Sequence, residues 1–329
     1  MELREFGPDD VASIKTFVEI DNAMHVDAPW LHPATVYRRQ MAVRYGWDGE
    51  PGRHFLAYDG DRPVGLLVVH YTDYDNLELA WLHVAIRPKE RRQGHGRALL
   101  EAAYDVCRAM KRPLVGTDGW DNDVTRAFAA ATGFEQKSQG IMRRQHLAEL
   151  PAGLADRLYD EAAPSAKDYE LVRMTGYTAD DLLGPLAEAA AAINDAPMDD
   201  LEIEDEVFSA ERIRAYEEAQ IKGGHRFYRI IARHRDTGEL AGHTVVTVDN
   251  EAPTIGDQHD TSVVRSHRGH RLGQLLKADM LRWLAEVEPQ VATIDTFNAE
   301  SNDHMVGINE VLGYRIMGRE LEYQRRVPD

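Results

Sequence analysis

The chain contains very little cysteine, since Cys107 is the only one among its 329 residues. A single cysteine excludes a disulfide framework and a zinc site built from several thiolates. Cys107 also lies in a helical stripe of apolar residues, which favours a place in the core over a role as a nucleophile. We therefore expect no bound metal.

Long hydrophobic runs are also missing. No apolar stretch approaches the roughly 18 residues that a membrane-spanning helix needs. The first residues, Met1-Glu2-Leu3-Arg4, lead directly into a strand-like pattern, so no signal peptide is expected. The content of 43% hydrophobic and 29% charged residues is that of a soluble globular protein. These features predict a cytoplasmic protein that does not bind membranes.

Positive charge is scarce as well. The chain has 38 Lys and Arg residues against 56 Asp and Glu residues, which gives a formal net charge of −18. Such a chain repels the phosphates of DNA and RNA, so we expect no nucleic-acid partner. Its few basic segments suit a small polyanion better. The length allows two domains of ordinary size, and either a monomer or a homodimer fits.

The most distinctive basic segment is Arg91-Arg92-Gln93-Gly94-His95-Gly96-Arg97-Ala98. It follows an apolar run and precedes a helical pattern that extends to Met110. Glycines allow a tight turn in which N–H groups converge on phosphate oxygens, and a helix N-terminus adds partial positive charge. A P-loop would need Gly-Lys-Ser/Thr, and a Rossmann loop would need a third glycine. The segment therefore predicts a phosphate-binding loop of another kind, and a glycine-containing surface turn is the alternative.

The pattern Arg-x-x-Gly-x-Gly after a strand resembles the acyl-CoA loop of the GNAT superfamily of N-acetyltransferases. A degraded copy, Arg268-Gly269-His270-Arg271-Leu272-Gly273, begins 177 residues after Arg91. The same 177 residues separate Val64-Gly65 from Ala241-Gly242, and 180 residues separate Gly133-Phe134 from Gly313-Tyr314. Landmarks in one order at nearly constant spacing indicate an internal duplication.

The resemblance implies an α/β fold (α+β, with a mixed sheet) made of two tandem GNAT-like domains. Each copy shows a strand, helical stretches, a hairpin, the strand before the loop, the loop with its helix, another strand and a final helix. Each domain is expected to be a mixed, mostly antiparallel sheet flanked by helices. We place the N-terminal domain at residues 1–148, a linker at 149–168 and the C-terminal domain at 169–329.

The resemblance also implies acetyl-CoA as the co-substrate and points to the residues that hold it. The strand before the loop would pair with the pantetheine arm, the loop would bind the pyrophosphate, and a helix-leading asparagine would help to seat CoA. In the first copy these positions are Val84, Ile86, Arg91, Arg92, Gln93, Gly94, His95, Gly96, Arg97, Ala98 and Asn122. In the second copy they are Thr261, Val263, Arg268, Arg271, Gly273 and Asn302. Both asparagines are equally suited to cap their helices.

The second loop departs from the pattern, because Arg271 stands where the first loop has Gly94. If this position has positive φ, a non-glycine residue there costs about 1 kcal/mol. Arg271 could donate its amide and add a cation near phosphate, or it could fill the space that CoA needs. CoA binding by the second copy therefore stays open.

Acetyl transfer to an amine needs a neutral amine, a polarised thioester carbonyl and a proton for the leaving thiolate. In the family, the usual base is a carboxylate or histidine on the strand before the loop. This implies Glu78 in the first copy, and Asp257 and His259 in the second. The second copy's strand, Gly256 to Val263, is unusually polar for a strand beside the core, which predicts a lined cavity or, alternatively, an edge strand.

The tyrosine that often acts as general acid in the family is missing from both copies, because Ala129 and Asn309 occupy its positions. A thiolate can leave without it, so catalysis is not excluded. On the acceptor side, seven of the twelve residues from Asp195 to Glu206 are acidic. In GNAT folds this segment covers the acceptor pocket, where acids would attract a cationic amine. A solvated acidic loop is the simpler interpretation.

These observations together predict an N-acetyltransferase. It would move an acetyl group directly from acetyl-CoA to a primary amine of a small, cationic acceptor. Two alternatives stay open: a non-catalytic acyl-CoA-binding sensor, and a protein in which one copy is active and the other is purely structural.

Overall fold

The computed structural model describes residues 1–328, which form two compact units. Unit 1 comprises Met1–Gly140, Met198–Asp205 and the residues from 318 onward, and unit 2 comprises Ile141–Pro197 and Glu206–Met317. The units are therefore not the two consecutive segments that the duplication suggests. The end of the chain belongs to unit 1, and the expected linker at 149–168 belongs to unit 2.

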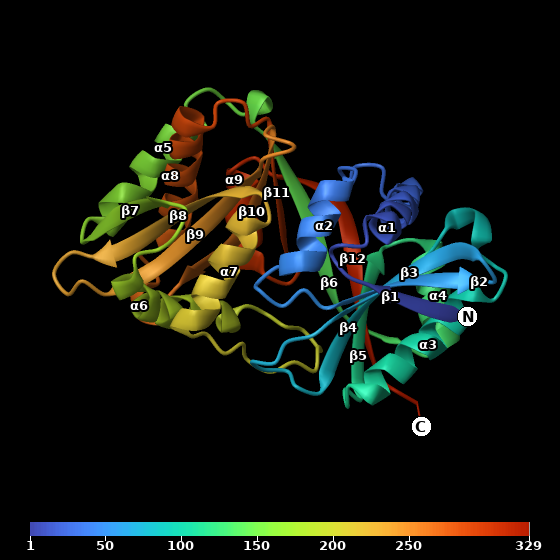
Figure 1. The fold of residues 1–329 in the computed structure, drawn as a ribbon. Helices are drawn as coiled ribbons and strands as arrows, with labels where there is room; N and C mark the ends of the chain where they lie inside the picture. The colour runs from blue at the N-terminus through green and yellow to red at the C-terminus, as the bar shows by residue number, and fades with distance from the viewer. Residues whose placement is uncertain (329) are drawn as a thin grey trace. The chain divides into compact units, whose positions relative to one another are not determined.

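Unit 1 begins with β1 (Glu2–Phe6), α1 (Val11–Ala23), α2 (Val36–Tyr45), β2 (Arg53–Asp59), β3 (Arg62–His70) and β4 (Leu79–Ile86). Helix α3 (His95–Ala109), β5 (Leu114–Trp120), α4 (Asp123–Thr132) and the first half of β6 (Glu135–His146) follow. The sheet order is β1-β2-β3-β4-β5-β12, where β12 (Arg315–Arg326) is the last strand of the chain (Figure 1). The β4–β5 pair is parallel, and the other neighbours in this series are antiparallel.

Helices cover both faces of the unit 1 sheet (Figure 1). On one face, Leu99 of α3 packs in a cluster with Leu321 and Tyr323 of β12. On the other face, Phe17 of α1 packs in a cluster with Leu66 of β3. Because Leu321 is fully buried, the last strand of the chain completes the core of unit 1.

Unit 2 starts within β6 and continues through α5 (Leu154–Ala162), β7 (Tyr169–Thr175), α6 (Asp180–Ala190) and α7 (Ala210–Lys222). Strands β8 (His225–His234), β9 (Leu240–Asp249) and β10 (Ile255–Val263) precede α8 (Leu272–Val287), β11 (Thr293–Ala299) and α9 (Asp303–Val311). The sheet order is β6-β11-β10-β9-β8-β7, and β10 pairs with β11 in parallel, as β4 does with β5. The predicted α/β fold with a mixed sheet in each copy is confirmed.

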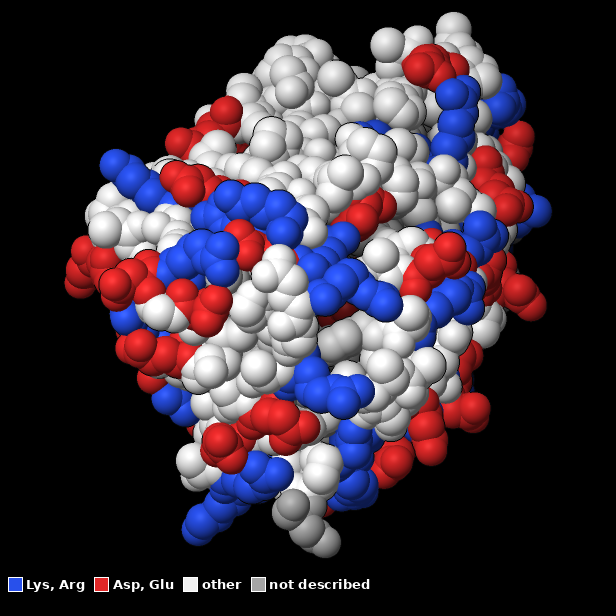
Figure 2. Space-filling model, turned by 90° about the vertical axis from the view of Figure 1, so that its right-hand side faces the viewer, with Lys and Arg blue, Asp and Glu red and all other residues white. Residues whose placement is uncertain are grey.

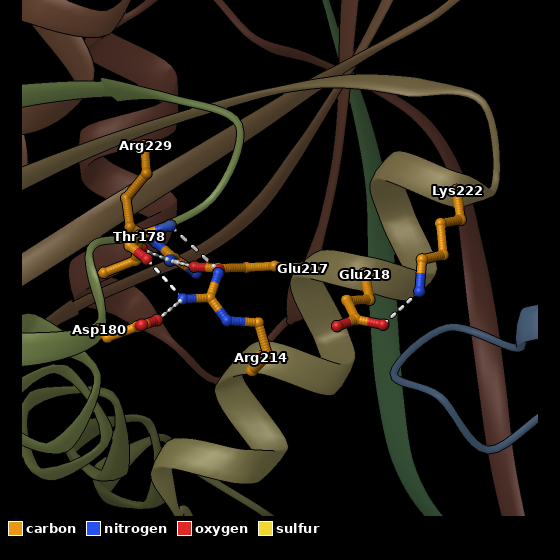
Figure 3. A network of polar contacts seen from close by, with 7 residues as sticks. All are labelled: Thr178, Asp180, Arg214, Glu217, Glu218, Lys222 and Arg229. Atoms are coloured by element: carbon orange, nitrogen blue, oxygen red, sulfur yellow. Dashed lines mark hydrogen bonds and ion pairs between the residues drawn. The ribbon is translucent and has the colours of Figure 1, made fainter.

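Both faces of the unit 2 sheet carry apolar clusters, and one of them also carries a buried ion pair. On one face α5 and α8 form an apolar core, so the helix of the expected linker is a packed part of the unit. On the other face Arg229 and Glu217, both at most 1% exposed, form an ion pair (Figure 3). The Thr178 hydroxyl lies 2.6 Å from Arg229 Nη1, and Arg214 bonds Glu217 at 2.8 Å. These partners offset the cost of burying the charges, which would otherwise be several kcal/mol for each ion.

The surface mixes both signs of charge. On the face that Figure 2 shows, basic and acidic side chains alternate, so the net charge is not gathered there into a patch of one sign. Across residues 1–328, every helix is too short or too polar to cross a membrane.

Candidate functional site

A cavity of about 910 Å³ opens in unit 1 where β4 and β5 separate. Their ladder pairs Leu79–Leu82 with Leu114–Thr117 and then ends, and the Thr117 hydroxyl donates to the Leu82 carbonyl at 2.8 Å. Beyond this point, residues 83–86 and 118–120 line the cavity from its two sides. Backbone groups buried along a sheet need partners, so the opening suits a ligand that carries amide groups of its own.

The N-terminus of α3 lies at the same cavity. Its N-cap residue, Gly94, has φ +88°, and no side chain caps the helix. The first amides of α3 therefore remain available to an anion, which the helix end favours. A Cβ at Gly94 would meet no atom within 4 Å, so a larger side chain would enter the open space before the helix. This geometry fits a pyrophosphate.

Arg91 is held by the protein itself. Its Nη2 lies 2.5 Å from Asp27 Oδ2, and its Nε donates to the Ile86 carbonyl at 3.3 Å. Arg91 therefore ties the segment after α1 to the end of β4, and its charge is balanced. Arg92 is exposed, and Arg97 donates to the Ala131 carbonyl at 3.2 Å.

Most of the CoA-binding positions predicted in the first copy meet at this cavity. Nine of them line it: Val84, Ile86, Arg91, Arg92, Gly94, Gly96, Arg97, Ala98 and Asn122. Gln93 and His95 do not line it. Asn122 is also the N-cap of α4, because its Oδ1 accepts from the Thr125 amide at 2.9 Å.

Glu78, the base predicted for the first copy, lies elsewhere. It precedes β4 at the paired end of the β4–β5 ladder, opposite to the opening. Its side chain is 73% exposed and lies 3.5 Å from Arg326. Glu78 does not line the cavity.

Four carboxylates line the cavity: Asp21 and Asp27 near its Arg91 side, and Asp118 of β5 and Glu320 of β12, which the sequence analysis did not single out. The Trp81 indole N–H donates to Asp118 at 2.5 Å. Burial raises the pKa of Glu320, and the neighbouring Asp118 raises it further. Sequence reasoning missed both residues. Asp118 follows the buried part of its strand directly, a signal that could have been used, whereas nothing in the sequence around Glu320 indicates its place beside β5.

The cavity also contains aromatic groups. Tyr323 of β12 and Ala129, which stands at the position of the missing tyrosine, both line it. Burial raises the pKa of Tyr323, so its hydroxyl stays protonated at neutral pH. Trp120 lines the cavity too, and its ring meets that of Trp30 edge to face at 5.3 Å.

The second loop keeps the backbone form of the first. Gly269 and Arg271 have φ of +86° and +55°, and the equivalent Arg92 and Gly94 have +62° and +88°. Arg271 thus has the positive φ for which the sequence analysis weighed a cost. At the helix beyond it, Gly273 approaches Ile308, whose Cδ1 would lie 3.2 Å from an added Cβ.

The side chains of the second loop bond to unit 2 itself. Arg268 donates to Asp195 at 2.6 Å and to the Val263 carbonyl at 3.0 Å. Arg271 donates to the Glu161 carbonyl at 3.3 Å. Asn302 caps α9 as Asn122 caps α4, since its Oδ1 accepts from the Met305 amide at 3.1 Å.

The polar strand β10 is irregular, with a register shift between Gln258 and Thr261. His259 is bonded by the Tyr216 hydroxyl and lies 3.1 Å from Thr247 Oγ1, so both ring nitrogens have partners. Burial lowers the pKa of His259 to about 3. Thr261 Oγ1 bonds Thr244 Oγ1 at 2.7 Å. These bonds account for much of the strand's polarity without a ligand.

Asp257, the other base predicted for the second copy, lies on β10 before the register shift, where the strand still pairs with β11. Its side chain is half-buried. The acidic run divides between the units. Asp195 accepts a hydrogen bond from Arg268 in unit 2, whereas Met198–Asp205 belongs to unit 1.

Comparisons with known proteins give several matches. Residues 17–134 match the acetyltransferase (GNAT) family. A mycothiol acetyltransferase of Clavibacter sepedonicus is 27% identical over 328 residues, which cover 98% of this chain and 94% of that protein. A mycothiol acetyltransferase of Streptosporangium roseum is 33% identical over 167 residues, covering 49% of this chain and 45% of that protein.

Solved structures show the same arrangement over the full length. A tandem GNAT protein from the clavulanic acid biosynthesis pathway, solved without AcCoA, superposes with a TM-score of 0.80 at 25% identity, covering 100% of this chain and 99% of that one. A GCN5-related N-acetyltransferase from Sphaerobacter thermophilus shares the fold, with a TM-score of 0.69 at 14% identity, 100% of this chain and 96% of that one. The chain is an acyltransferase whose first copy matches the GNAT acetyltransferase family and whose full length is similar to a tandem GNAT protein.

Proposed function

We propose that unit 1 transfers an acetyl group from acetyl-CoA to a primary amine of a small, cationic acceptor. The observation that carries the proposal is the course of one cavity. It reaches from the uncapped N-terminus of α3, along the end of the β4–β5 ladder, to the carboxylates of Asp118 and Glu320. These are places for a pyrophosphate, an amide-bearing arm and an ammonium group.

The residues that would hold acetyl-CoA are those of the first loop and the open strand edge. The amides of Gly96 and Arg97 at the start of α3 would bind phosphate oxygens. Val84 and Ile86 would offer backbone groups to the pantetheine arm. When bound, the thioester supplies an activated acetyl carbon.

The chain's own residues then have three tasks. Asp118 and Glu320 attract the ammonium form of the acceptor, and a carboxylate there removes its proton. Burial and Asp118 raise the pKa of Glu320 to about 9, so Glu320 is a stronger base once ionised, and a bound ammonium group favours that ionised form. The protonated hydroxyl of Tyr323 is the group that we assign to returning a proton to the CoA thiolate.

Unit 2 has the weaker case for catalysis. Its loop arginines bond to Asp195 and to a backbone carbonyl of α5, and both ring nitrogens of His259 have partners. We propose that the first copy is the active one. This supports the alternative in which the other copy is structural.

The experiment is a calorimetric titration of acetyl-CoA into the wild type and into Gly94→Glu and Arg271→Glu. The two variants introduce the same side chain at equivalent loop positions of the two units. We expect Gly94→Glu to abolish binding by bulk and like-charge repulsion, and Arg271→Glu to leave it unchanged. Binding that survives Gly94→Glu would overturn the assignment of the first loop.

Turnover is followed as release of the CoA thiol to a thiol-reactive dye in the presence of small amines. Cys107 will not disturb this assay, since it is fully buried and burial raises its pKa to about 11. Amine-dependent release that is lost in Gly94→Glu supports the proposal. Binding of acetyl-CoA without release of the CoA thiol in the presence of any amine would favour the alternative of a non-catalytic acyl-CoA-binding sensor.

A further inference from the structure

The segment Met198–Asp205, here called the strap, lies in unit 1 although the residues on both sides of it lie in unit 2. Side-chain amides hold its backbone. The Glu202 amide donates to Gln324 Oε1 at 2.7 Å, and the Glu204 amide donates to Asn76 Oδ1 at 2.8 Å. Gln324 is fully buried and lies on β12, the strand that also carries Glu320. The strap is therefore fixed to the strand that forms one wall of the cavity.

The strap brings carboxylates with it. Glu202 forms an ion pair with Arg326 at 3.0 Å, so its charge is compensated. Asp199 accepts a hydrogen bond from the Ser138 hydroxyl at 2.6 Å. It has φ +48°, a left-handed conformation that L-residues seldom adopt. The contacts of the strap hold Asp199 in this conformation.

Ser138 links Asp199 to the cavity wall. It also hydrogen-bonds Glu322, which lies on β12 directly opposite Asp118 of β5. Asp118 in turn lines the cavity together with Glu320. Asp199, Ser138, Glu322 and Asp118 thus form a continuous series of polar side chains from the strap to the cavity.

We propose that the strap determines acceptor specificity in unit 1, with Asp199 as a positioning residue that acts through Ser138 and Glu322 on Asp118. The inference rests on the proposed function, because it concerns the amine site of the same cavity. It assigns to the second half of the chain a part in the first unit's chemistry. The favoured acceptor is a small organic cation that carries a second positive charge besides the reacting amine.

The physical reason is the repulsion among carboxylates. Glu322 is influenced by Asp118 and Asp199, and Glu320 by Asp118 and Glu322, with no basic side chain among their main influences. Like charges this close must share a proton or gain a cation. A cationic acceptor in the cavity provides that cation, and the charge of Asp199 increases the preference for it over a neutral molecule of the same shape.

The test compares Asp199→Asn with Asp205→Asn. Both residues are exposed and both changes remove one negative charge from the strap, but Asp205 lies outside the series that leads to Asp118. The probes are putrescine, with two ammonium groups, and n-butylamine, with one. We expect Asp199→Asn to raise KM for putrescine about 5- to 10-fold relative to n-butylamine, with little change in kcat or in acetyl-CoA affinity. Asp205→Asn should leave KM for putrescine and KM for n-butylamine unchanged. Equal effects of the two variants would overturn the strap proposal.

A second measurement separates this proposal from the proposed function. Trp81 donates to Asp118, so the part of the emission that is lost in Trp81→Phe reports the ionisation of the neighbouring carboxylates without turnover. In a pH titration of tryptophan fluorescence, Asp199→Asn should move the midpoint that belongs to Glu322 to lower pH, because Asp199 raises the pKa of that carboxyl. An unmoved midpoint, or the same movement in Asp205→Asn, rejects the role of the strap. If the wild type releases no CoA with any amine, the proposed function fails, and the titration still decides whether the strap acts on Asp118.

Discussion

The substitution Leu321→Ala tests whether the last strand of the chain belongs to the core of unit 1. Leu321 is fully buried in the cluster that contains Leu99 of α3, and it pairs with Gly119 of β5. A buried leucine replaced by alanine loses about 2–5 kcal/mol, and about 3 kcal/mol is a central value for a well-packed site. With an m-value of about 2 kcal/mol/M, the urea midpoint of unit 1 should fall by about 1.5 M.

The assay is urea unfolding followed by tryptophan fluorescence. Four of the five tryptophans lie in unit 1, and Trp283 alone lies in unit 2, so the signal reports mainly unit 1. Acetyl-CoA at about 100 times its Kd should restore about 2.7 kcal/mol, because it binds only the folded unit.

The matched control is Ile316→Ala on the same strand. Ile316 is 43% exposed and belongs to unit 2, so its substitution should cost at most about 0.5 kcal/mol. A midpoint for Leu321→Ala that equals the control's would refute the assignment of the last strand to unit 1. A lowered midpoint that acetyl-CoA does not raise would contradict the binding of acetyl-CoA to the folded unit.

Three further predictions concern single side chains. Arg271→Gly should stabilise unit 2 by up to about 1 kcal/mol, because left-handed strain is relieved at φ +55°, and a lower melting temperature would contradict this. Burial and Asp118 raise the pKa of Glu320 above its ordinary 4.5, so the folded protein keeps a proton that the unfolded chain releases. The folded state therefore loses stability relative to the unfolded chain as pH rises above about 4.5. The free energy of unfolding, measured with urea, should therefore fall less from about pH 5 to about pH 8 in Glu320→Gln than in the wild type. The same decrease in both proteins would contradict the raised pKa of Glu320. Tyr323→Phe should lower kcat about 100-fold without changing acetyl-CoA affinity, as measured by CoA release, and an unchanged kcat would remove Tyr323 as the proton donor.

Local rules explain which parts of the site could be predicted. The glycine loop and α3 are neighbours in sequence, so the positions of Gly94, Gly96 and Ala98 at the cavity follow from the motif itself. The alternation of side chains assigned Glu78 to one face of β4, but it gave no information about where along the strand the cavity opens. The ladder with β5 ends only at Leu82, so the cavity opens at the far end of β4 from Glu78.

The acidic run shows a different limit. Its composition indicates a negative segment, and that description holds. The inclusion of its segment Met198–Asp205 in unit 1 depends on hydrogen bonds to Gln324 and Asn76, which are more than 100 residues away in sequence. No periodicity within the run reports such partners.

The sequence by itself determined the duplication, the likeness to the family and the glycine loop, because each depends on residues close together in the chain or on spacing that repeats. The tertiary structure alone decided that β12 completes unit 1, that Glu320 joins Asp118 at the cavity, and that Tyr323 stands in the same cavity as Ala129. The physical reason is strand pairing. Backbone hydrogen bonds between β5 and β12 join segments about 200 residues apart, and any strand with a suitable apolar face could have taken that place. Only the packing of Leu321 and Tyr323 into the core of unit 1 selects this one.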